Sequence, residues 1–559
     1  MTFDRVPLVA TIRSYRKSFL RPDLLTGVVL ATMLIPQGMA YAELTGLPSV
    51  TGIYTTIAAL VGYSLFGPNR HLVLGPDSSL APVIAAVILP LAAGNPADAI
   101  AFASMMSLLT GVVCILAGLF RLGVVTELLS RPMRVGYLNG IAVLIFVSQL
   151  PKALGIATEA TAPWAVVGES ARALVEGSVD WATLALSVGC IVVILFLNRV
   201  SRLKPGVLVA ALGSIAVVAI FGLAVSLVGE VPSGLPPLAF PGTGLTALPT
   251  LALGALAVAL VSFADTGALS TATAHKTGER VDPNSEIMAL GSANLFSGMF
   301  QGFATSASSS RTAVALAVGS RTQVAGLVAA VGVVAIIALA PGFVSEMPEA
   351  TLAAIVMSAS FALFDWKGWS WLLRVRRSEF LLSFVTALAV VAIGVLEGIG
   401  LALVLSLLNF VRKAWRPHST ELGKIAGVPG YHDRERHPEA EVVEGLLIIR
   451  YDAPLFFANA PDFGRTLMEK LDHADRPITG VLVVGNAITD IDSTGAEILA
   501  QVLDDLGGRG VRFSFGGLKG PVKDRLRAYG LYDRIGDANF LPNTIAGVEA
   551  HRGDDAGGD

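Results

Sequence analysis

Long apolar runs separated by short polar connections fill the chain from Leu24 to Val411. The clearest charge-free runs are Leu24–Ala42, Ala99–Phe120, Gly206–Gly229 and Thr322–Ser345. Each is long enough to cross ~30 Å of hydrocarbon as a helix. Shorter candidates lie at 49–66, 77–93, 135–151, 182–198, 249–264, 284–303, 309–319, 350–364, 380–396 and 398–411. The pattern predicts an all-α polytopic membrane domain of about fourteen transmembrane elements, in which 77–93 and 309–319 are half-helices.

Two polar, helix-breaking patches interrupt these runs, one in each half of the chain. They are His71–Ser79 and Ala304–Thr312, and the second carries Arg311. Irregular backbone survives in hydrocarbon only where protein or a water-filled cavity satisfies its polar groups. Interruptions at corresponding places in two halves indicate a binding site at the midplane of a transporter. A positive charge at that site favours an anion as the transported substrate.

The half-helix starts supply the chemistry for such a site. Asp77, Ser78 and Ser79, just after Gly75-Pro76, offer capping oxygens in the first patch, and Ser308, Ser309 and Ser310 repeat the pattern in the second. Two helix N-termini that converge at mid-membrane form an anion site from their amides and dipoles. Arg311 adds a full charge. The alternative is that the serines form a helix face that packs closely against another helix, and that the Arg311 side chain extends to the membrane interface.

Three further polar residues lie within predicted spans. Gln37 and Tyr41, four residues apart after Pro36, share one helix face and either line the anion site or make a helix–helix hydrogen bond. Asp265 lies in the run Ala257–Ala274, where an acid is costly unless paired or protonated. It either binds Na⁺ or carries a proton for symport, or it is a structural partner of Arg311 or Lys276. Asp77 as an ionised carboxylate would repel an anion, so it is protonated, turned away or a cation ligand.

Basic residues alternate with the spans in a regular way. With the predicted number of spans they all fall on one side of the membrane, whereas the opposite loops hold acids such as Asp98 and Glu349 and few bases. The positive-inside rule then places both termini in the cytoplasm. The bases are Arg13, Arg16, Lys17, Arg21, Arg121, Arg131, Arg134, Arg199, Arg202, Lys204, Lys276, Arg280, Lys367, Arg374, Arg376, Arg377, Arg412, Lys413 and Arg416.

The composition changes after Trp415. Strands are predicted at Gly445–Tyr451, Ile478–Gly485 and Val511–Leu518, and helices at Pro461–Ala474, Ala496–Leu506 and Pro521–Tyr529, which indicates a small α/β domain. Ser493 follows Asp492 at the predicted start of a helix. It is either an ordinary cap neighbour or a phosphorylation site, because the helix dipole tolerates added negative charge. The predicted domains are an N-terminal cytoplasmic segment (1–23), the membrane domain (24–415), a linker (416–441), the α/β domain (442–551) and a disordered tail (552–559).

Composition supports a membrane protein and excludes several classes. The 559 residues are 53% hydrophobic and 15% charged, with a mean hydropathy of +0.67. The net charge of -3 gives no argument for nucleic acid. Cys114 and Cys190 lie in apolar runs, so free thiols are expected, and the seven histidines show no metal-ligand spacing. No Walker A pattern indicates ATP drive, no cofactor is expected, and no removable signal peptide is predicted.

Several linked motifs resemble the SulP family of anion transporters, the sulfate permease group that includes prestin and pendrin. Ile-Pro-Gln-Gly-Met-Ala-Tyr-Ala at 35–42, Gly-Leu-Pro at 46–48 and Gly-Ile-Tyr at 52–54 resemble the first-span signature. Arg70-His with Leu74-Gly-Pro76 resembles the third-span entry, and Ser310-Arg-Thr312 the tenth-span motif. The C-terminal region is similar to STAS domains.

The resemblance implies seven-plus-seven inverted repeats in which a core domain (spans 1–4 and 8–11) moves against a gate domain (spans 5–7 and 12–14), as in nucleobase transporters. It implies that the anion contacts Gln37, Tyr41, Ser308, Ser310 and Arg311, and that position 77, aromatic in some animal members, lines the site as Asp77. An acid near Asp265 is what cation-coupled bacterial members use. The serine of the STAS motif corresponds to Ser493, and family members are usually dimers.

The sequence therefore predicts a secondary transporter, not an enzyme, in a bacterial inner membrane. It moves sulfate, bicarbonate or a small carboxylate with H⁺ or Na⁺ by elevator-like alternating access. A nucleobase–cation symporter is the alternative within the same class, although Arg311 counts against it. A membrane-tethered signalling protein, with the STAS domain as output toward a cytoplasmic partner, is the alternative from another class.

Overall fold

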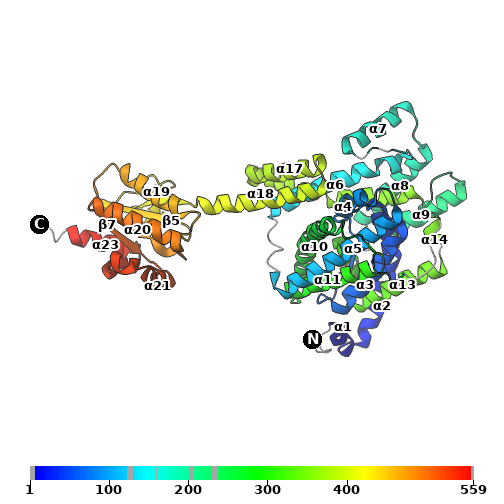
Figure 1. Ribbon diagram of the computed structural model, residues 1–559, viewed down its shortest axis with the longest axis horizontal. Coiled ribbons are helices and arrows are strands. Elements are labelled where there is room, and N and C mark those ends of the chain that lie inside the picture. Colours follow the sequence, from blue (N-terminus) through cyan, green and yellow to red (C-terminus); the bar gives the residue numbers. More distant parts are fainter. Residues whose placement is uncertain are drawn as a thin grey trace. The chain divides into compact units, whose positions relative to one another are not determined.

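The computed structural model describes residues 7–122, 130–158, 160, 162–200, 206–229, 237–340 and 342–555. The chain divides into two compact units, Met1–Ser406 and Leu407–Asp559. The first is helical, and the second is built on a sheet (Figure 1).

Fourteen helices that begin in the first unit correspond to the fourteen predicted elements. Within the described ranges, eight helices are long and apolar enough to cross a membrane, and α4, α9 and α13 are shorter apolar helices. The fourteen are α2 (Lys17–Leu44), α3 (Ser49–Phe66), α4 (Ala81–Ala92), α5 (Pro96–Leu119), α6 (Arg131–Leu154), α8 (Trp181–Val200), α9 (Gly206–Phe221), α10 (Leu248–Thr277), α11 (Pro283–Met299), α12 (Ser309–Val318), α13 (Val324–Leu339), α15 (Glu349–Leu363), α17 (Arg377–Ala392) and α18 (Val395–Trp415).

The two half-helices come third in each group of seven, and a short strand precedes each. β1 (Leu74–Gly75) precedes α4, and β2 (Ser306–Ala307) precedes α12. The two strands pair antiparallel, with Leu74 opposite Ala307 and Gly75 opposite Ser306. The chain thus passes through the middle of the unit in opposite directions, as inverted repeats require, and the predicted fold class is confirmed.

Small residues let the helices of the first unit pack closely. A Cβ on Gly52 of α3 would overlap the carbonyl of Gly38 in α2, and a Cβ on Gly111 of α5 would lie 2.8 Å from the carbonyl oxygen of Gly291 in α11. Close approach through glycine is how membrane helices gain van der Waals contact. These contacts join a first helix set, α2–α5 with α10–α13.

A second helix set comprises α6, α8, α9, α15, α17 and α18. In it, a Cβ on Gly140 of α6 would lie 2.8 Å from the carbonyl oxygen of Ala387 in α17. The sets meet where α15 and α9 pack on α2 and where α4 meets α6. They have the membership of the expected core and gate.

The structure differs from the predicted elements in several places. The run Gly206–Gly229 is helical only to Phe221, and Thr322–Ser345 yields α13 and the short α14 (Gly342–Ser345). The additional helices are α1 (Pro7–Arg13), α7 (Pro163–Glu176) and α16 (Trp366–Val375). The search for apolar runs passed over them because charged residues end or interrupt each one. Arg202, Lys204 and residues 1–6 lie outside the described residues.

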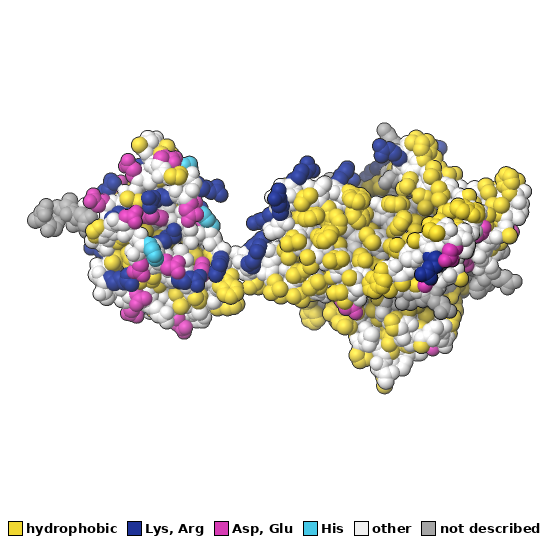
Figure 2. Space-filling model, turned by 90° about the horizontal axis from the view of Figure 1, so that it is seen from above, with side chains coloured by type: hydrophobic (Ala, Val, Ile, Leu, Met, Phe, Trp, Pro, Cys, Tyr) yellow, Lys and Arg dark blue, Asp and Glu magenta, His cyan; other side chains and the backbone are white. Residues whose placement is uncertain are grey.

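Apolar side chains cover much of the outer surface of the first unit. Exposed examples from α8 are Val188, Val192 and Phe196, and from α9 Leu212 and Ile220. Figure 2 shows a broad hydrophobic face on this unit, with Lys and Arg along part of its edge. Such an exposed apolar surface is stable only against lipid.

The second unit contains a six-stranded sheet in the order β4-β3-β5-β6-β7-β8. β5, β6, β7 and β8 pair in parallel, and β3 pairs antiparallel with β4 and β5. The strands are β3 (Ser419–Gly423), β4 (His432–Asp433), β5 (Gly445–Tyr451), β6 (Ile478–Val484), β7 (Arg512–Gly516) and β8 (Phe540–Leu541). The helices are α19 (Ala460–Asp472), α20 (Ser493–Gly508), α21 (Gly520–Ala528), α22 (Leu531–Ile535) and α23 (Thr544–Asp555).

The alternation of strand residues divides the core of this unit into two parts. Leu447 and Ile449 of β5 join a cluster with Leu499 of α20, whereas Leu446 and Ile448 join one with Val548 of α23. The segment 416–441, predicted as a linker, contains β3 and β4. Of the predicted tail 552–559, residues 552–555 continue α23 and 556–559 lie outside the described residues.

Candidate functional site

The β1–β2 pair brings the starts of the two half-helices together. Besides the strand bonds, the Ser308 amide donates to the Val73 carbonyl at 3.1 Å. Ser308 is the N-cap position of α12, and Asp77 opens the turn that leads into α4. The first amides of a helix have no intrahelical acceptor and carry the positive end of its dipole. Two such ends therefore meet near the middle of the helical unit.

A cavity of about 760 Å³ lies at this meeting point. Five predicted substrate residues line it, and so does the predicted coupling acid Asp265. The five are Gln37, Tyr41, Asp77, Ser308 and Ser310. Both helix sets contribute to the walls, because α6, α8, α9 and α15 also line the cavity. The structure thus collects residues that are more than 250 positions apart in the chain.

Arg311 lies behind the strand pair and is not part of the cavity wall. Its side chain is 1% exposed, and its Nη2 donates to the Pro76 carbonyl at 2.7 Å. Nη2 is also 3.8 Å from Oδ2 of Asp77. Among the described residues, Nε and Nη1 have no hydrogen-bond partner. The guanidinium ties the α12 half to the α4 half and places a positive charge directly beneath the two helix starts.

Gly75 makes room for this arginine. A Cβ at position 75 would lie 2.6 Å from Nη1 of Arg311, closer than van der Waals contact permits. The guanidinium therefore packs against bare backbone, which a side chain at this strand position would prevent.

Asp77 is turned toward its own helix start. Its Oδ1 accepts hydrogen bonds from the amide of Ser79 at 2.9 Å and from the hydroxyl of Ser79 at 2.7 Å. Its Oδ2 faces Arg311. The carboxyl group therefore caps α4 and balances the guanidinium, which accounts for an acid beside an anion cavity.

Asp265 faces the cavity from α10. The hydrogen bond that the structure gives it joins Oδ2 to the Ser79 hydroxyl at 3.1 Å. The alternative partners weighed from the sequence, Arg311 and Lys276, lie elsewhere: Arg311 pairs with Asp77, and Lys276 belongs to the last turn of α10.

Gln37 and Tyr41 share the α2 face that borders the cavity. Gln37 is 7% and Tyr41 8% exposed. On the opposite wall, the hydroxyls of Ser308 and Ser310 are 3.1 Å apart, so the two serines form one polar patch at the start of α12.

The sequence reasoning missed two kinds of site residue. Ser78 and Ser79 line the cavity beside Asp77 but were counted only as cap residues. Arg131 and Arg134 of α6 also line it, although the sequence indicated them only as bases at the inner end of a span. The pattern of basic residues could have suggested that arginines surround the opening of the cavity. No feature of the sequence predicts that Ser79 lies between two acids.

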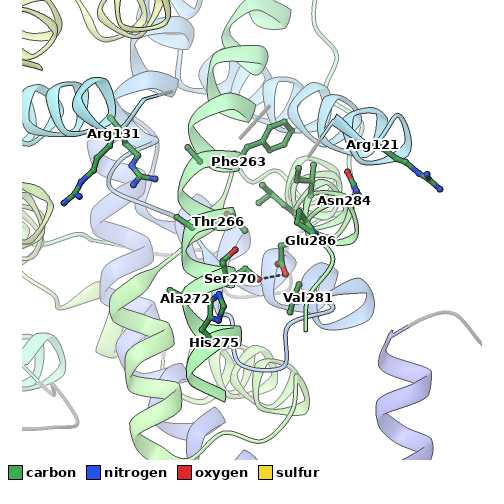
Figure 3. Close-up of a pocket in the computed structure, with 18 of the residues that line it drawn as sticks. Arg121, Arg131, Phe263, Thr266, Ser270, Ala272, His275, Val281, Asn284 and Glu286 are labelled. Carbon is green, nitrogen blue, oxygen red and sulfur yellow. Dashed lines mark hydrogen bonds between the residues drawn. The ribbon is translucent and has the colours of Figure 1, made fainter. Parts of the chain in front are cut away.

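A second cavity of about 690 Å³ adjoins α10. In it, Oε1 of Glu286 accepts from the Tyr63 hydroxyl at 2.6 Å and Oε2 accepts from the Ser270 hydroxyl at 2.8 Å. Figure 3 shows Glu286 and Ser270 pointing toward one another, with His275 nearby and Arg131 to the left of α10. The bonds join α3, α10 and α11, so this buried acid braces the first helix set.

In the second unit, Ser493 is the first residue of α20. Asp492 provides the cap: Oδ1 accepts from the Gly495 amide at 2.7 Å and Oδ2 from the Phe457 amide at 2.8 Å. Ser493 is exposed at the positive end of the helix dipole. Cys114 and Cys190 are buried free thiols, and the described residues contain no cluster of three His, Cys, Asp or Glu side chains that could hold a metal ion.

Comparisons with known proteins agree with this architecture. Residues 20–386 match the Sulfate permease family, and residues 437–547 match the STAS domain. A probable sulfate transporter of Mycobacterium tuberculosis is 37% identical over 549 residues, which cover 98% of each chain. The murine Solute Carrier 26 family member A9 anion transporter, solved in the inward-facing state, matches with a TM-score of 0.89 and 20% identity over 99% of this chain and 94% of that one. The transmembrane domain of a cyanobacterium bicarbonate transporter matches with a TM-score of 0.61 and 24% identity, over 69% and 98% of the two chains.

Proposed function

The chain belongs to the sulfate permease family of anion transporters, and we propose that it is a secondary active transporter that carries sulfate, bicarbonate or a small carboxylate together with H⁺ or Na⁺. The observation that carries the proposal is the β1–β2 pair, which joins the starts of α4 and α12 over the buried charge of Arg311.

The electrostatics of the cavity favour an anion. Each helix start acts as roughly half a positive charge. The full charge of Arg311 is balanced by Asp77, 3.8 Å away. The helix ends and the serine hydroxyls of Ser308 and Ser310 therefore supply net attraction, as at other anion-binding helix N-termini.

Asp265 adds the coupling to a cation. When it is ionised, a second negative charge faces the cavity and opposes anion entry. When a proton or Na⁺ neutralises it, the anion is accepted. Cation and anion then enter the cavity together, which is the requirement for symport.

The lining residues support alternating access with the cavity open on one side. Arg131 begins α6, Asn198 lies near the end of α8, Val207 near the start of α9 and Leu363 at the end of α15, and all of these line the cavity. The mouth therefore lies at the side of the membrane where α6 begins. At the other end of α6, Lys152 pairs with Glu43 of α2 and links the two helix sets. Movement of the first set against the second would close one side and open the other.

The names of the similar proteins support the proposed cargo. The mycobacterial relative is named a probable sulfate transporter, and a structural neighbour is a bicarbonate transporter. Both anions are small, oxygen-rich and negatively charged, so amides, hydroxyls and a buried guanidinium suit either.

The basic residues around the mouth support cytoplasmic termini and, for a bacterial chain, location in the inner membrane. A homodimer, phosphorylation of Ser493 and a cytoplasmic protein partner of the STAS domain complete the proposal. The exposed position of Ser493 at a capped helix start supports the modification.

The test is uptake by the purified chain in proteoliposomes. The panel contains labelled sulfate, bicarbonate and small carboxylates, each with and without a Na⁺ or pH gradient. Arg311→Lys and Arg311→Ala are expected to lose most uptake of the transported anion. Arg321→Ala, which removes an exposed arginine of the same segment, is the matched control and is expected to retain it. Unchanged transport in Arg311→Ala would remove the guanidinium from the mechanism.

A further inference from the structure

Ser79 lies between the two acids of the anion cavity. Its Oγ is 2.7 Å from Oδ1 of Asp77 and 3.1 Å from Oδ2 of Asp265. Ser79 is 1% exposed and lies on the turn before α4, whereas Asp265 comes from α10. A single buried hydroxyl thus bridges carboxyl groups that are 188 positions apart in the chain (265 − 77).

The number of protons limits what this bridge can be. A serine hydroxyl has one proton to donate and two lone pairs to accept with. Two ionised carboxylates would have to compete for that one proton. Both contacts are full hydrogen bonds only when one of the two carboxyl groups brings its own proton.

The surroundings indicate which acid carries that proton. Asp77 accepts from the amide and hydroxyl of Ser79 and faces Arg311 at 3.8 Å, so two donors and a cation already surround its two oxygens. Asp265 has the Ser79 hydroxyl as its hydrogen-bond partner in the described structure. The arrangement is therefore complete when Asp265 donates to Ser79 and Ser79 donates to Asp77.

Other polar groups around the acids come from three more helices. α6 brings Arg134 and Tyr137, α2 brings Tyr41, and α12 brings Arg311. Arg134 and Arg311 are permanent cations, and the two tyrosines are neutral near pH 7. The change of charge is therefore assigned to Asp265, because Asp77 already has the amide of Ser79 and the guanidinium of Arg311 beside it.

We propose that Ser79 is a positioning residue that transmits the protonation of Asp265 to the anion site; this rests on the proposed function. With Asp265 protonated, Ser79 caps α4 through Asp77, and the cavity has no excess negative charge. When the proton leaves Oδ2 of Asp265 for water in the cavity, the hydroxyl is shared between two carboxylates. Asp77 then loses part of its capping bond, and a second negative charge faces the anion. Proton and anion consequently bind together.

The experiment measures the apparent affinity for labelled sulfate in proteoliposomes between about pH 5.5 and about pH 8, where sulfate keeps its own charge. The wild-type protein is expected to bind sulfate more weakly as the pH rises. Ser79→Ala is expected to weaken binding most at acid pH, where the wild-type bridge is complete. It should therefore reduce the ratio of the affinity at the acid end to the affinity at the alkaline end by about tenfold, the contribution of a hydrogen bond to a charged group. Ser79→Thr retains the hydroxyl and is expected to restore the ratio.

Ser358→Ala is the matched control, because Ser358 lines the same cavity from α15 and lies outside the bridge. It is expected to keep the wild-type ratio. A wild-type ratio in Ser79→Ala, while Asp265→Asn abolishes the pH dependence, would overturn the role of Ser79 and leave the proposed function intact. Absence of uptake of sulfate, bicarbonate and the small carboxylates by the wild type, or equal pH dependence in the wild type and Asp265→Asn, would instead count against the proposed function. If the affinity for sulfate changed with the Na⁺ concentration and not with pH, the proposal that a proton is shared through Ser79 would be wrong.

Discussion

The ammonium group of Lys152 lies 2.8 Å from Oε2 of Glu43, and this ion pair joins α6 of the second helix set to α2 of the first. Glu43 also accepts a hydrogen bond from the Ser49 hydroxyl at 2.8 Å through its other oxygen, which fixes its orientation. The pair lies at the end of α6 opposite the cavity mouth. It must break if the cavity is to open on that side.

Removal of this ion pair is expected to favour opening on the closed side. Lys152→Ala and Glu43→Gln should each shift the equilibrium two- to fivefold, because a pair whose side chains are 37% and 13% exposed contributes only ~0.5–1 kcal/mol. The measurement is labelling of Ala359→Cys, on the cavity wall, by a membrane-impermeant thiol reagent added from that side. The exchanged pair Lys152→Glu with Glu43→Lys should return labelling toward the wild-type rate. Equal labelling of all variants would show that the pair does not hold the closed side.

Gly75→Ala is expected to weaken anion binding at least tenfold without unfolding the protein. Its Cβ would meet Nη1 of Arg311 at 2.6 Å, so the guanidinium must move away from the strand pair. Binding of labelled anion and elution of the purified protein in detergent measure the two effects. Gly213→Ala in α9, where a Cβ would meet nothing within 4 Å, is the control and should behave as wild type. Normal affinity in Gly75→Ala would mean that the position of the guanidinium is not critical.

Asp265→Asn is expected to abolish dependence on the driving cation while anion exchange continues. An asparagine keeps the size of the side chain and the bond to Ser79, 3.1 Å away in the wild type, but has no charge to neutralise. Concentrative uptake under a pH or Na⁺ gradient and anion-for-anion exchange without a gradient separate the two activities. Glu286→Gln, which changes a buried acid of the first helix set outside the anion cavity, tests whether loss of any buried carboxylate has the same result. Symport that persists in Asp265→Asn contradicts the coupling assignment.

Asp492→Ala is expected to loosen the start of α20, whereas Ser493→Ala should not. The aspartate accepts from the amides of Gly495 and Phe457, and loss of a cap costs ~1 kcal/mol. Hydrogen exchange of the full chain should therefore accelerate about fivefold at these two amides in Asp492→Ala. Similar acceleration in Ser493→Ala would assign the cap to the serine and argue against a hydroxyl available for phosphorylation.

The β3–β4 hairpin should depend on pH through Asp433. A hydrogen bond from buried Thr420, aided by His418 and the Glu435 amide, lowers the pKa of Asp433 against the smaller opposing effect of burial. Because the folded-state pKa is below that of the unfolded chain, the carboxylate stabilises the hairpin above about pH 4 and this contribution is lost as the pH falls through the folded-state pKa. Asp433→Asn should therefore speed hydrogen exchange of the Arg434 amide, which bonds the Glu421 carbonyl, at neutral pH. The difference from wild type should narrow in acid; a constant difference would contradict the pKa assignment.

The strands of the second unit show which elements the local sequence pattern can predict and which it cannot. β5 begins and ends where the apolar run Gly445–Tyr451 predicted, because its alternating side chains are buried on both faces. β3 was assigned to a linker because Ser419–Gly423 is polar and gains its strand partners only from β4 and β5. β3 is the second strand of the sheet, between β4 and β5, and these partners rather than an apolar run of its own make it a strand.

The family resemblance implied that Gln37, Asp77 and Arg311 belong to one region. The residue pattern by itself determined that this chain spans a membrane, that α4 and α12 are half-helices, and that Arg311 lies at a break between apolar runs. These follow from apolar length, helix-breaking residues and the cost of charge in hydrocarbon, all of which act locally. Only the tertiary structure decided that Arg311 lies behind Gly75 and outside the cavity wall, and that Ser79 bridges Asp77 and Asp265. Such relationships depend on how helices that are distant in the chain pack together, and the periodicity of a single helix does not predict them.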